Sequence, residues 1–261
     1  MKLGRKPRGF NLAIPHYHAV RTMSMAQNGW VPPALKPGLD NAANLPANLG
    51  MMLNDQLGDC TCAGMGHETQ LVSFDAQGVM ITPPDADVLK AYEAVAGYNP
   101  ATGANDDGAQ EQTVLQYWQR YGLAYHGGRH KISGYAEVDV RNPDDVCEAI
   151  QEGGCAYIGF DVPSGLMDDV QNGVTVWDAK PSYGAIEGGH CVVVTGFNRY
   201  TPTAPEFNLI SWGSKFSMTW AFWQQYVDEA YMLIDPMWIE RTGTSPWGLT
   251  EAQIEQIAQT V

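Results

Sequence analysis

Three short blocks of residues that can do covalent chemistry follow one another along the chain. Residues 54–60 read NDQLGDC and end in Cys60, residues 188–190 read GGH and end in His190, and residues 211–213 read SWG. A cysteine thiol becomes a strong nucleophile when a base takes its proton, and histidine is the usual base. His190 lies 130 residues after Cys60, a spacing at which only the fold can bring the two side chains together. The order of the blocks therefore predicts a thiol nucleophile paired with a distant imidazole.

Cys60 is expected where a glycine-containing turn passes into a helix. Gly58 relieves the backbone of the tight turn, and residues 60–74 have the apolar spacing of a helix, with Asp59 as its N-cap. Free backbone N–H groups at a helix N-terminus lower the pKa of a thiol and stabilise an oxyanion. This position favours a nucleophile over an inert buried cysteine.

His190 directly precedes residues 191–195 (CVVVT), whose β-branched composition predicts a strand. The end of a strand would place the imidazole at the edge of a cleft with a pKa suited to proton transfer. His67 lies two helical turns beyond Cys60 and is too far along the helix to act as the base. The remaining histidines fall in loop-like segments and receive no role: His16, His18, His126 and His130.

Together the blocks resemble the papain-like cysteine peptidase superfamily, particularly its bacterial and phage-borne members, whose nucleophile block has the form NDxxGDC. Over residues 40–240 the resemblance implies an α+β, two-lobed fold, with a helical lobe followed by an antiparallel β-rich lobe and a cleft between them. It implies that Cys60 attacks a carbonyl carbon and that His190 moves the proton. It also implies that Asn54 and the backbone N–H of Cys60 hold the oxyanion.

Two alternatives concern the first block. Gln56 precedes Cys62 by six residues, which is the spacing of the oxyanion glutamine and the nucleophile in papain itself. The Gly58-to-Cys60 turn matches the family turn better, and Asn54 then occupies the six-before position with a shorter amide. Cys60 is therefore preferred over Cys62, and Asn54 over Gln56 as the oxyanion donor.

The third block departs from the family pattern, in which an Asn precedes Ser-Trp-Gly and orients the catalytic histidine. This chain has Ile210 at that position. Ser211 is adjacent, but alternation along a strand predicts that its side chain points to the opposite face unless a bulge intervenes. Asn208 lies two residues before Ile210 and on its face. Ser211 and Asn208 are therefore the two candidates for orienting His190.

Composition limits the partners and cofactors of the protein. Twenty-nine acidic and 15 basic residues give a net charge of −14 over 261 residues, which argues against nucleic acid or an anionic membrane as partner. No stretch reaches 18 apolar residues, so no membrane span is predicted. Five cysteines without a regular framework predict reduced thiols and an intracellular origin. Their spacing fits no zinc site, and no cofactor or metal is expected.

The chain is expected to consist of an extended N-terminal arm (1–39), a papain-like domain (40–240) and a C-terminal tail with a short helix (241–261). The basic start of the arm could dock on an acidic surface, and Asp228 and Glu229 are expected to diverge as surface charges. The predicted helices are 60–74, 88–96, 113–121, 144–151 and 220–226. The predicted strands are 131–140, 156–160, 191–195, 207–211 and 232–234.

The function expected from these features is hydrolysis of peptide or other amide bonds, with a peptide or protein as substrate. An alternative follows from the resemblance to phage and prophage products and from the long arm: a virion or assembly protein that contacts other phage particle proteins. A third, weaker option is a transglutaminase-like amide exchanger with the same Cys–His pair. The expected location is the cytoplasm of a bacterial host, or a virion. The fold alone does not choose among these functions.

Overall fold

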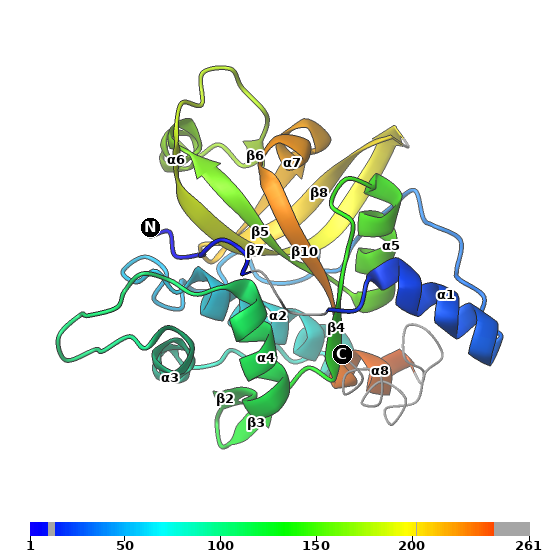
Figure 1. The fold of residues 1–261 in the computed structure, drawn as a ribbon, viewed down its shortest axis with the longest axis horizontal. Coiled ribbons are helices and arrows are strands. Elements are labelled where there is room, and N and C mark those ends of the chain that lie inside the picture. Colours follow the sequence, from blue (N-terminus) through cyan, green and yellow to red (C-terminus); the bar gives the residue numbers. More distant parts are fainter. Residues whose placement is uncertain (10–13, 202, 243–261) are drawn as a thin grey trace.

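A helical lobe and a sheet lobe lie against each other in the computed structural model, which describes residues 1–9, 14–201 and 203–242 (Figure 1). The helical lobe contains α2 (Cys60–Gln77), α3 (Asp85–Ala96), α4 (Glu111–Tyr121) and a small hairpin of β2 (Leu123–Tyr125) and β3 (Gly128–His130). Nearly every residue in the first four turns of α2 is buried. A helix that is apolar or buried on all sides lies inside a protein, and α2 accordingly runs between the other helices and the sheet.

The sheet lobe is built on one eight-stranded sheet in the order β4-β10-β5-β7-β8-β9-β6, with β1 also paired to β7. All pairings are antiparallel except that of β6 with β9. The strands are β1 (Gly38–Asp40), β4 (Gly134–Glu137), β5 (Ala156–Pro163), β6 (Val176–Trp177), β7 (Ile186–Thr201), β8 (Ala204–Ser211), β9 (Ser214–Thr219) and β10 (Val227–Ile234). The other helices are α1 (Tyr17–Asn28), α5 (Pro143–Gly153), α6 (Ser164–Gln171), α7 (Trp220–Tyr226) and α8 (Pro236–Thr242).

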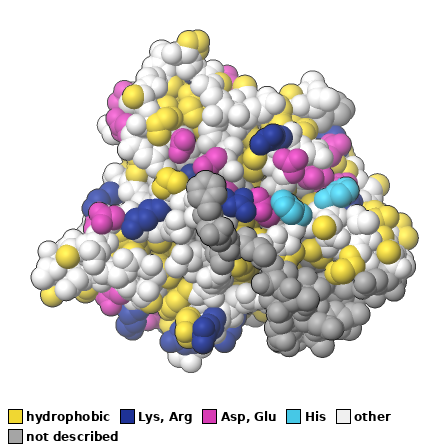
Figure 2. Space-filling model, viewed as in Figure 1, with side chains coloured by type: hydrophobic (Ala, Val, Ile, Leu, Met, Phe, Trp, Pro, Cys, Tyr) yellow, Lys and Arg dark blue, Asp and Glu magenta, His cyan; other side chains and the backbone are white. Residues whose placement is uncertain are grey.

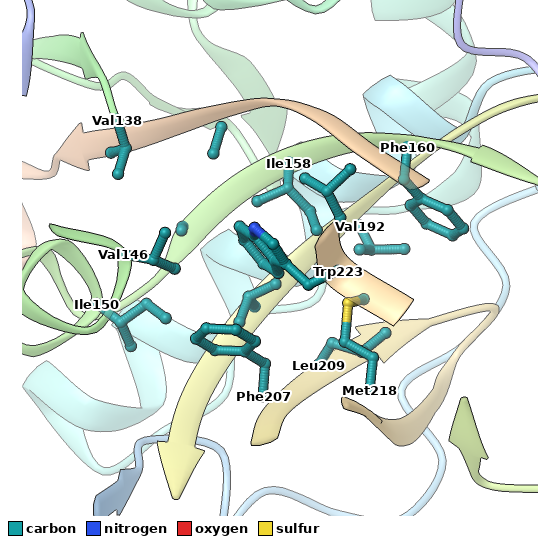
Figure 3. Close-up of a cluster of buried hydrophobic side chains, with 14 of the residues drawn as sticks. Val138, Val146, Ile150, Ile158, Phe160, Val192, Phe207, Leu209, Met218 and Trp223 are labelled. Atoms are coloured by element: carbon teal, nitrogen blue, oxygen red, sulfur yellow. The ribbon is translucent and has the colours of Figure 1, made fainter. Parts of the chain in front are cut away.

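The central strands are buried on both faces. In β7, Val192 and Val194 belong to the core formed with α5 and α7, whereas Cys191 and Val193 belong to the core of the helical lobe. Figure 3 shows the first of these cores, in which Trp223 of α7 packs beside the sheet residues. Because successive side chains of a strand point to opposite faces, a continuous apolar run is required where both faces are covered. This explains the uninterrupted run 191–194 in the sequence.

The predicted α+β order, with helices before antiparallel strands, is confirmed. All five predicted helices form, mostly with slightly wider bounds. The predicted strand 131–140 is shorter than expected, since β4 covers only Gly134–Glu137. Helix α1 within the arm was not anticipated from its proline-rich sequence, and α8 was not predicted either. The tail proposed for 241–261 lies almost entirely outside the described residues.

A buried polar cluster joins the two lobes below α2. Glu68 of α2, His130 of β3 and Asp235 directly after β10 have donor atoms within 4.8 Å of one another. One ring nitrogen of His130, Nδ1, is 2.8 Å from Thr69 Oγ1, and the other, Nε2, is hydrogen-bonded to Asp235. Asp235 also accepts the backbone N–H of Met237 at 2.7 Å and so caps α8. One side chain therefore links the hairpin, the sheet end and α8.

We expect Asp235→Ala to lower the free energy of unfolding by about 3 kcal/mol, because it leaves a buried polar partner uncompensated and removes a cap. Asp87→Ala is the matched control, since among the described residues the ion-pair partner of Asp87 is the largely exposed Lys90, and such pairs contribute little. Urea unfolding of both variants checks the expectation. Equal midpoints for the two would show that the cluster does not stabilise the fold.

Candidate active site

Cys60 is the first residue of α2, as the sequence predicted. Asp59 is the N-cap residue of α2, as expected, but its side chain makes no capping hydrogen bond to the helix. The Asp59 carboxyl is buried instead, and burial raises its pKa to about 8. The N–H groups of the first turn are therefore not neutralised by a carboxylate cap. Their partial positive charge can therefore stabilise a negative charge on the Cys60 sulfur or on an atom beside it.

His190 lies inside β7, four residues after the strand begins. Its Nε2 is 2.8 Å from the Oγ of Ser211 in the neighbouring strand β8. The indole of Trp212 stacks on the imidazole, with ring centroids 4.2 Å apart and 12° between the planes. The second nitrogen, Nδ1, is buried and has no hydrogen-bond partner among the described residues. The ring is thus held on one side and has a free nitrogen on the other.

The first turn of α2 packs against the part of β7 that carries His190. The backbone N–H groups of Cys191 and Gly4 lie beside the Cys60 sulfur and favour its thiolate form. Further along the helix, Gly64 has no side chain, and a Cβ there would lie 3.5 Å from the Cys191 sulfur. The fold therefore brings Cys60 next to the residue that follows His190.

In this arrangement neither group is charged at neutral pH. Burial raises the pKa of the Cys60 thiol to about 12, and burial lowers the pKa of His190 to about 3. Each side chain is only 1% exposed. A thiolate–imidazolium pair needs solvent or preorganised dipoles to stabilise its charges. The site described here is consequently closed and neutral.

Ser211 reaches His190 without any bulge next to it. The pairing of Val193 with Ile210, and of Val194 with Leu209, places Ser211 on the same face of the sheet as His190. Ile210 is buried in the other core, on the side of the helical lobe. The expectation that Ile210 occupies the orienting position, with Ser211 turned away, is therefore wrong. The strand register assigns that position to Ser211.

The turn after Ser211 fixes this geometry. Trp212 and Gly213 have φ angles of 44° and 68° and connect Ser211 to Ser214 across a two-residue hairpin loop. Positive φ at both central residues matches the twist of paired strands. A Cβ on Gly213 would lie 2.6 Å from the carbonyl oxygen of Gly50. Asn208, the other candidate, pairs with Gly196 and lines a separate surface pocket.

The two oxyanion candidates differ in where their side chains lie. Asn54 is buried, and its Nδ2 donates to the carbonyl oxygens of Lys2 and Leu57 at 3.3 and 3.2 Å. Gln56 is exposed, and its amide is 3.5 Å from the neighbouring Asp55. Asn54 therefore already binds a carbonyl of the arm near Cys60, whereas Gln56 faces solvent.

Cys62, the alternative nucleophile, is fully buried. Burial raises the pKa of its thiol well above the ordinary value, and the other groups that affect it are Asp59, Thr61 and Cys60. All of these belong to the start of the same helix. No group of β7 is among those that affect the pKa of Cys62, whereas the backbone N–H of Cys191 in β7 affects the pKa of Cys60. The five cysteines are all free.

The start of the N-terminal arm runs through the space between the two lobes, as the dark blue segment shows (Figure 1). The backbone N–H of Arg5 donates to Gly189 at 3.0 Å, Lys6 donates to Ala109 at 2.9 Å, and Ala109 donates to Gly4 at 2.9 Å. The arm thus forms a parallel bridge with Ala109 and an antiparallel bridge with Gly189. It covers the residue before His190 like an added strand.

Close packing of glycines makes room for the arm. A Cβ on Gly4 would lie 1.8 Å from the carbonyl oxygen of Gly58, in the turn before Cys60. A Cβ on Gly108 would lie 1.7 Å from the carbonyl oxygen of Gly4. Both contacts are with backbone atoms, which cannot turn aside as a side chain can. The arm therefore fits only because glycine stands at these positions.

Charged side chains fasten the arm on either side of this contact. Lys2 pairs with Asp106, Arg8 pairs with Glu137, and Arg5 pairs with Glu229 and Asp228. Figure 2 shows acidic and basic side chains next to one another across the middle of this face. The basic start of the chain thus docks on acidic groups of its own domain. The sequence suggested such docking but gave no indication of the partner residues.

Glu68, His130 and Asp235 are a group of described residues whose donor atoms lie close enough to hold a metal ion. Sequence reasoning gave His130 no role. The cluster is enclosed by α2, the β2–β3 hairpin and the start of α8, and its hydrogen bonds to Thr69 and to the α8 backbone hold these elements together.

In the described part of the chain, no helix has both the length and the apolar character needed to cross a bilayer.

No protein-family model matches the sequence, and no curated protein matches it. Solved structures do match the fold. Xylellain, a cysteine protease from Xylella fastidiosa, superposes with a TM-score of 0.62 at 15% identity, covering 88% of this chain and 95% of that one. Bromelain from Ananas comosus matches with a TM-score of 0.51 at 12% identity, over 76% of this chain and 98% of that one.

A digestive procathepsin L 3 of Tenebrio molitor matches with a TM-score of 0.54 at 13% identity, over 78% of this chain and 72% of that chain. These neighbours are papain-like cysteine proteases, and the two-lobed papain-like fold expected from the sequence is confirmed. Identity this low establishes the fold and leaves the activity to be argued from the site.

Proposed function

We propose that this chain is a thiol hydrolase that cleaves peptide or other amide bonds with Cys60 as nucleophile and His190 as base. The observation that carries the proposal is the orientation of the imidazole: Nε2 is engaged by Ser211, and Nδ1 is free. Cys60 begins a helix that packs on the same stretch of strand. A nucleophile, an oriented base and helix dipoles are the parts that acyl transfer to a thiol requires.

Each step of the reaction has a residue to perform it. His190 Nδ1 takes the proton from the Cys60 thiol, and the sulfur attacks the substrate carbonyl carbon. The backbone N–H of Cys60 and the Nδ2 of Asn54 stabilise the negative oxygen that forms. His190 then gives its proton to the leaving amine, and a thioester remains. Water, deprotonated by His190, hydrolyses the thioester and frees the thiol.

Ser211 acts as the positioning residue in this scheme. With Nε2–H donating to the Ser211 hydroxyl, the imidazole is held in the tautomer that leaves Nδ1 unprotonated. Trp212 covers this hydrogen bond by stacking on the ring. A neutral hydroxyl stabilises an imidazolium less than a carboxylate would, so its contribution is mainly to orientation.

We expect Ser211→Ala to reduce kcat by about 10- to 100-fold with little change in KM. The base loses its orientation, whereas the contacts that bind the substrate remain. Ser214→Ala, in the same hairpin but on β9, is the control. The pH profile of kcat should also change, since the His190 pKa depends on the Nε2 partner. Unchanged kcat and pH profile would remove Ser211 from the mechanism.

The closed cleft favours a second candidate function. If the arm permanently fills the cleft, the chain is inactive, and the second function we propose is a virion or assembly protein that retains the papain-like shape. The docked arm and the neutral dyad support this alternative as long as the arm stays in place. One property distinguishes the two functions: whether displacement of residues 2–6 exposes Cys60.

The experiment that tests the proposal is digestion of a denatured bacterial proteome with the full-length Gly4→Ala variant, whose arm clashes with Gly58. New peptide termini are identified by mass spectrometry. Termini that appear with this variant and not with Gly4→Ala/Cys60→Ala support the hydrolase. A digest without new termini, although Cys60 is accessible to alkylation, would favour the virion protein.

A further inference from the structure

The guanidinium of Arg5 is surrounded by four carboxylates, and its side chain is 1% exposed. Its Nε and Nη2 are 2.9 and 2.5 Å from Oε1 of Glu229. Nη2 is also 2.6 Å from Asp228, Nε is 3.5 Å from Glu111, and Nη1 is 3.9 Å from Asp161. We call these four carboxylates the acidic pocket: Glu111, Asp161, Asp228 and Glu229.

Both Asp228 and Glu229 reach the pocket because β10 has a bulge there. The pairing with β5 shifts between Val227 and Glu229, so Asp228 is the extra residue. A bulge changes the direction of the side chains around it. The sequence-based expectation of a surface charge holds for Asp228, whose side chain is 48% exposed, and is wrong for Glu229. Glu229 is 2% exposed and faces the cleft.

The pocket is aligned with the nucleophile by strand register. Glu229 of β10 pairs with Gly159 of β5, and Gly159 pairs with Cys191 of β7, whose backbone N–H lies beside the Cys60 sulfur. Adjacent strands are about 4.8 Å apart. The row of three residues thus runs across the sheet from the base of the pocket to the catalytic sulfur.

Gly159 provides the space for the guanidinium. A Cβ at this position would lie 2.2 Å from Nε of Arg5 and 2.4 Å from Oε1 of Glu111. Glycine in the middle of a strand weakens the sheet, and it often marks the close approach of a ligand or another chain. The side chain of any larger residue at position 159 would occupy the space of the guanidinium.

Hydrogen bonds orient Glu229 of the acidic pocket toward a cation. Tyr231 donates its hydroxyl to Oε2 of Glu229 at 2.7 Å, and Gln112 donates to the Tyr231 hydroxyl at 3.1 Å. These bonds fix the Glu229 carboxylate with Oε1 turned toward the cleft. Burial raises the pKa of Glu111, the neighbouring Glu229 raises it further, and Arg5 opposes both effects. Departure of Arg5 would leave two buried acids without their cation.

We propose that the acidic pocket binds the arginine side chain of a polypeptide substrate, at the residue adjacent to the one that lies beside Cys60. The inference rests on the proposed function and names the substrate class of the same site. Gly4 occupies the position beside Cys60, and Arg5, the next residue, fills the pocket. A substrate that displaces the arm meets the same acceptor, the Gly189 carbonyl, and the same carboxylates.

The geometry favours a guanidinium over an ammonium group. Glu229 accepts from two nitrogens of the fork while Asp228 accepts from one of them at the mouth of the pocket. A planar group with several fixed donors satisfies two carboxylates at once, whereas lysine offers a single point charge on a flexible stem. Arginine should therefore be preferred over lysine as well as over neutral side chains.

The first test measures binding without catalysis. The full-length Gly4→Ala/Cys60→Ala variant is titrated with a fluorescent synthetic peptide of residues 1–9, and with the same peptide carrying citrulline at position 5. Citrulline keeps the shape of arginine and removes its charge. We expect about 100-fold weaker binding of the citrulline peptide, because polar sites strongly reject an analogue that leaves their groups unpaired. Equal affinities would overturn the proposal, whatever the activity of the enzyme.

The second test measures selectivity during cleavage. Peptides that differ only in arginine, lysine or citrulline at the pocket position are compared by kcat/KM with the Gly4→Ala variant. Glu229→Gln on this background should reduce the preference for arginine over citrulline by about 10-fold or more, and Glu206→Gln, on β8 outside the pocket, should not. Cleavage without a preference for arginine would overturn the acidic pocket and leave the proposed hydrolase standing. Cleavage of no peptide, together with a citrulline penalty in the binding test, would contradict the hydrolase alone.

Discussion

Alkylation of Cys60 by iodoacetamide at pH 7 should become at least about 100-fold faster in Gly4→Ala than in the wild-type protein. The added methyl group would lie 1.8 Å from the Gly58 carbonyl oxygen, and a backbone atom cannot move aside. The arm must therefore leave the cleft. Burial then no longer raises the pKa of the thiol to about 12, and the thiolate fraction increases by orders of magnitude.

Gly9→Ala is the matched control for arm displacement. It adds the same methyl group to the same arm, but the nearest atom, 3.1 Å away, belongs to the flexible side chain of Gln110. Peptide mapping of all five cysteines shows which one reacts. Slow labelling of Cys60 in both variants would mean that the arm does not control the site, and the virion alternative would gain support. Circular dichroism confirms that the variants remain folded.

Replacement of either member of the dyad in the Gly4→Ala background should lower kcat/KM by about 1,000-fold or more. Cys60→Ala removes the nucleophile, and His190→Ala removes the base that must deprotonate it. Because the two residues act as a unit, the double variant should be no less active than the worse single variant. Progress curves with a peptide that the parent variant cleaves measure all three.

Cys62→Ala distinguishes the two cysteines that the sequence left open. Its thiol lies two residues into α2 and is affected by the helix start alone, so the variant should keep most of the parent activity. Loss of activity in Cys62→Ala, with Cys60→Ala still active, would reverse the assignment. In that case Gln56 would also return as the oxyanion donor.

Arm release is the step that these predictions share. The arm uses the cleft residues that a substrate needs: the Gly189 carbonyl, the Asn54 amide and the acidic pocket. A substrate and the arm therefore compete for one set of contacts. We therefore expect the docked arm to protect the thiol, and removal of residues 2–6 to expose it.

Local sequence was sufficient for five of the helices, for the central strands and for two of the candidate chemical groups. The turn around Gly58 and the helix that starts at Cys60 depend on neighbouring residues alone. The same is true of the β-rich run after His190, which was expected as a strand and forms part of β7. These features follow from backbone preferences and hydrophobic periodicity, which act over a few residues.

The tertiary structure decided everything that depends on register or on contact between distant segments. Ser211 rather than Ile210 faces His190, because the pairing of β8 with β7 sets which residues share a face. The bulge in β10 turns Glu229 inward, and Arg5, more than 200 residues earlier in the chain, supplies its counter-charge. A one-residue change of register reverses a face, and the sequence of a single strand does not specify its partner. The sequence by itself thus identified the candidate reactive groups, and packing determined how they are oriented, covered and charged.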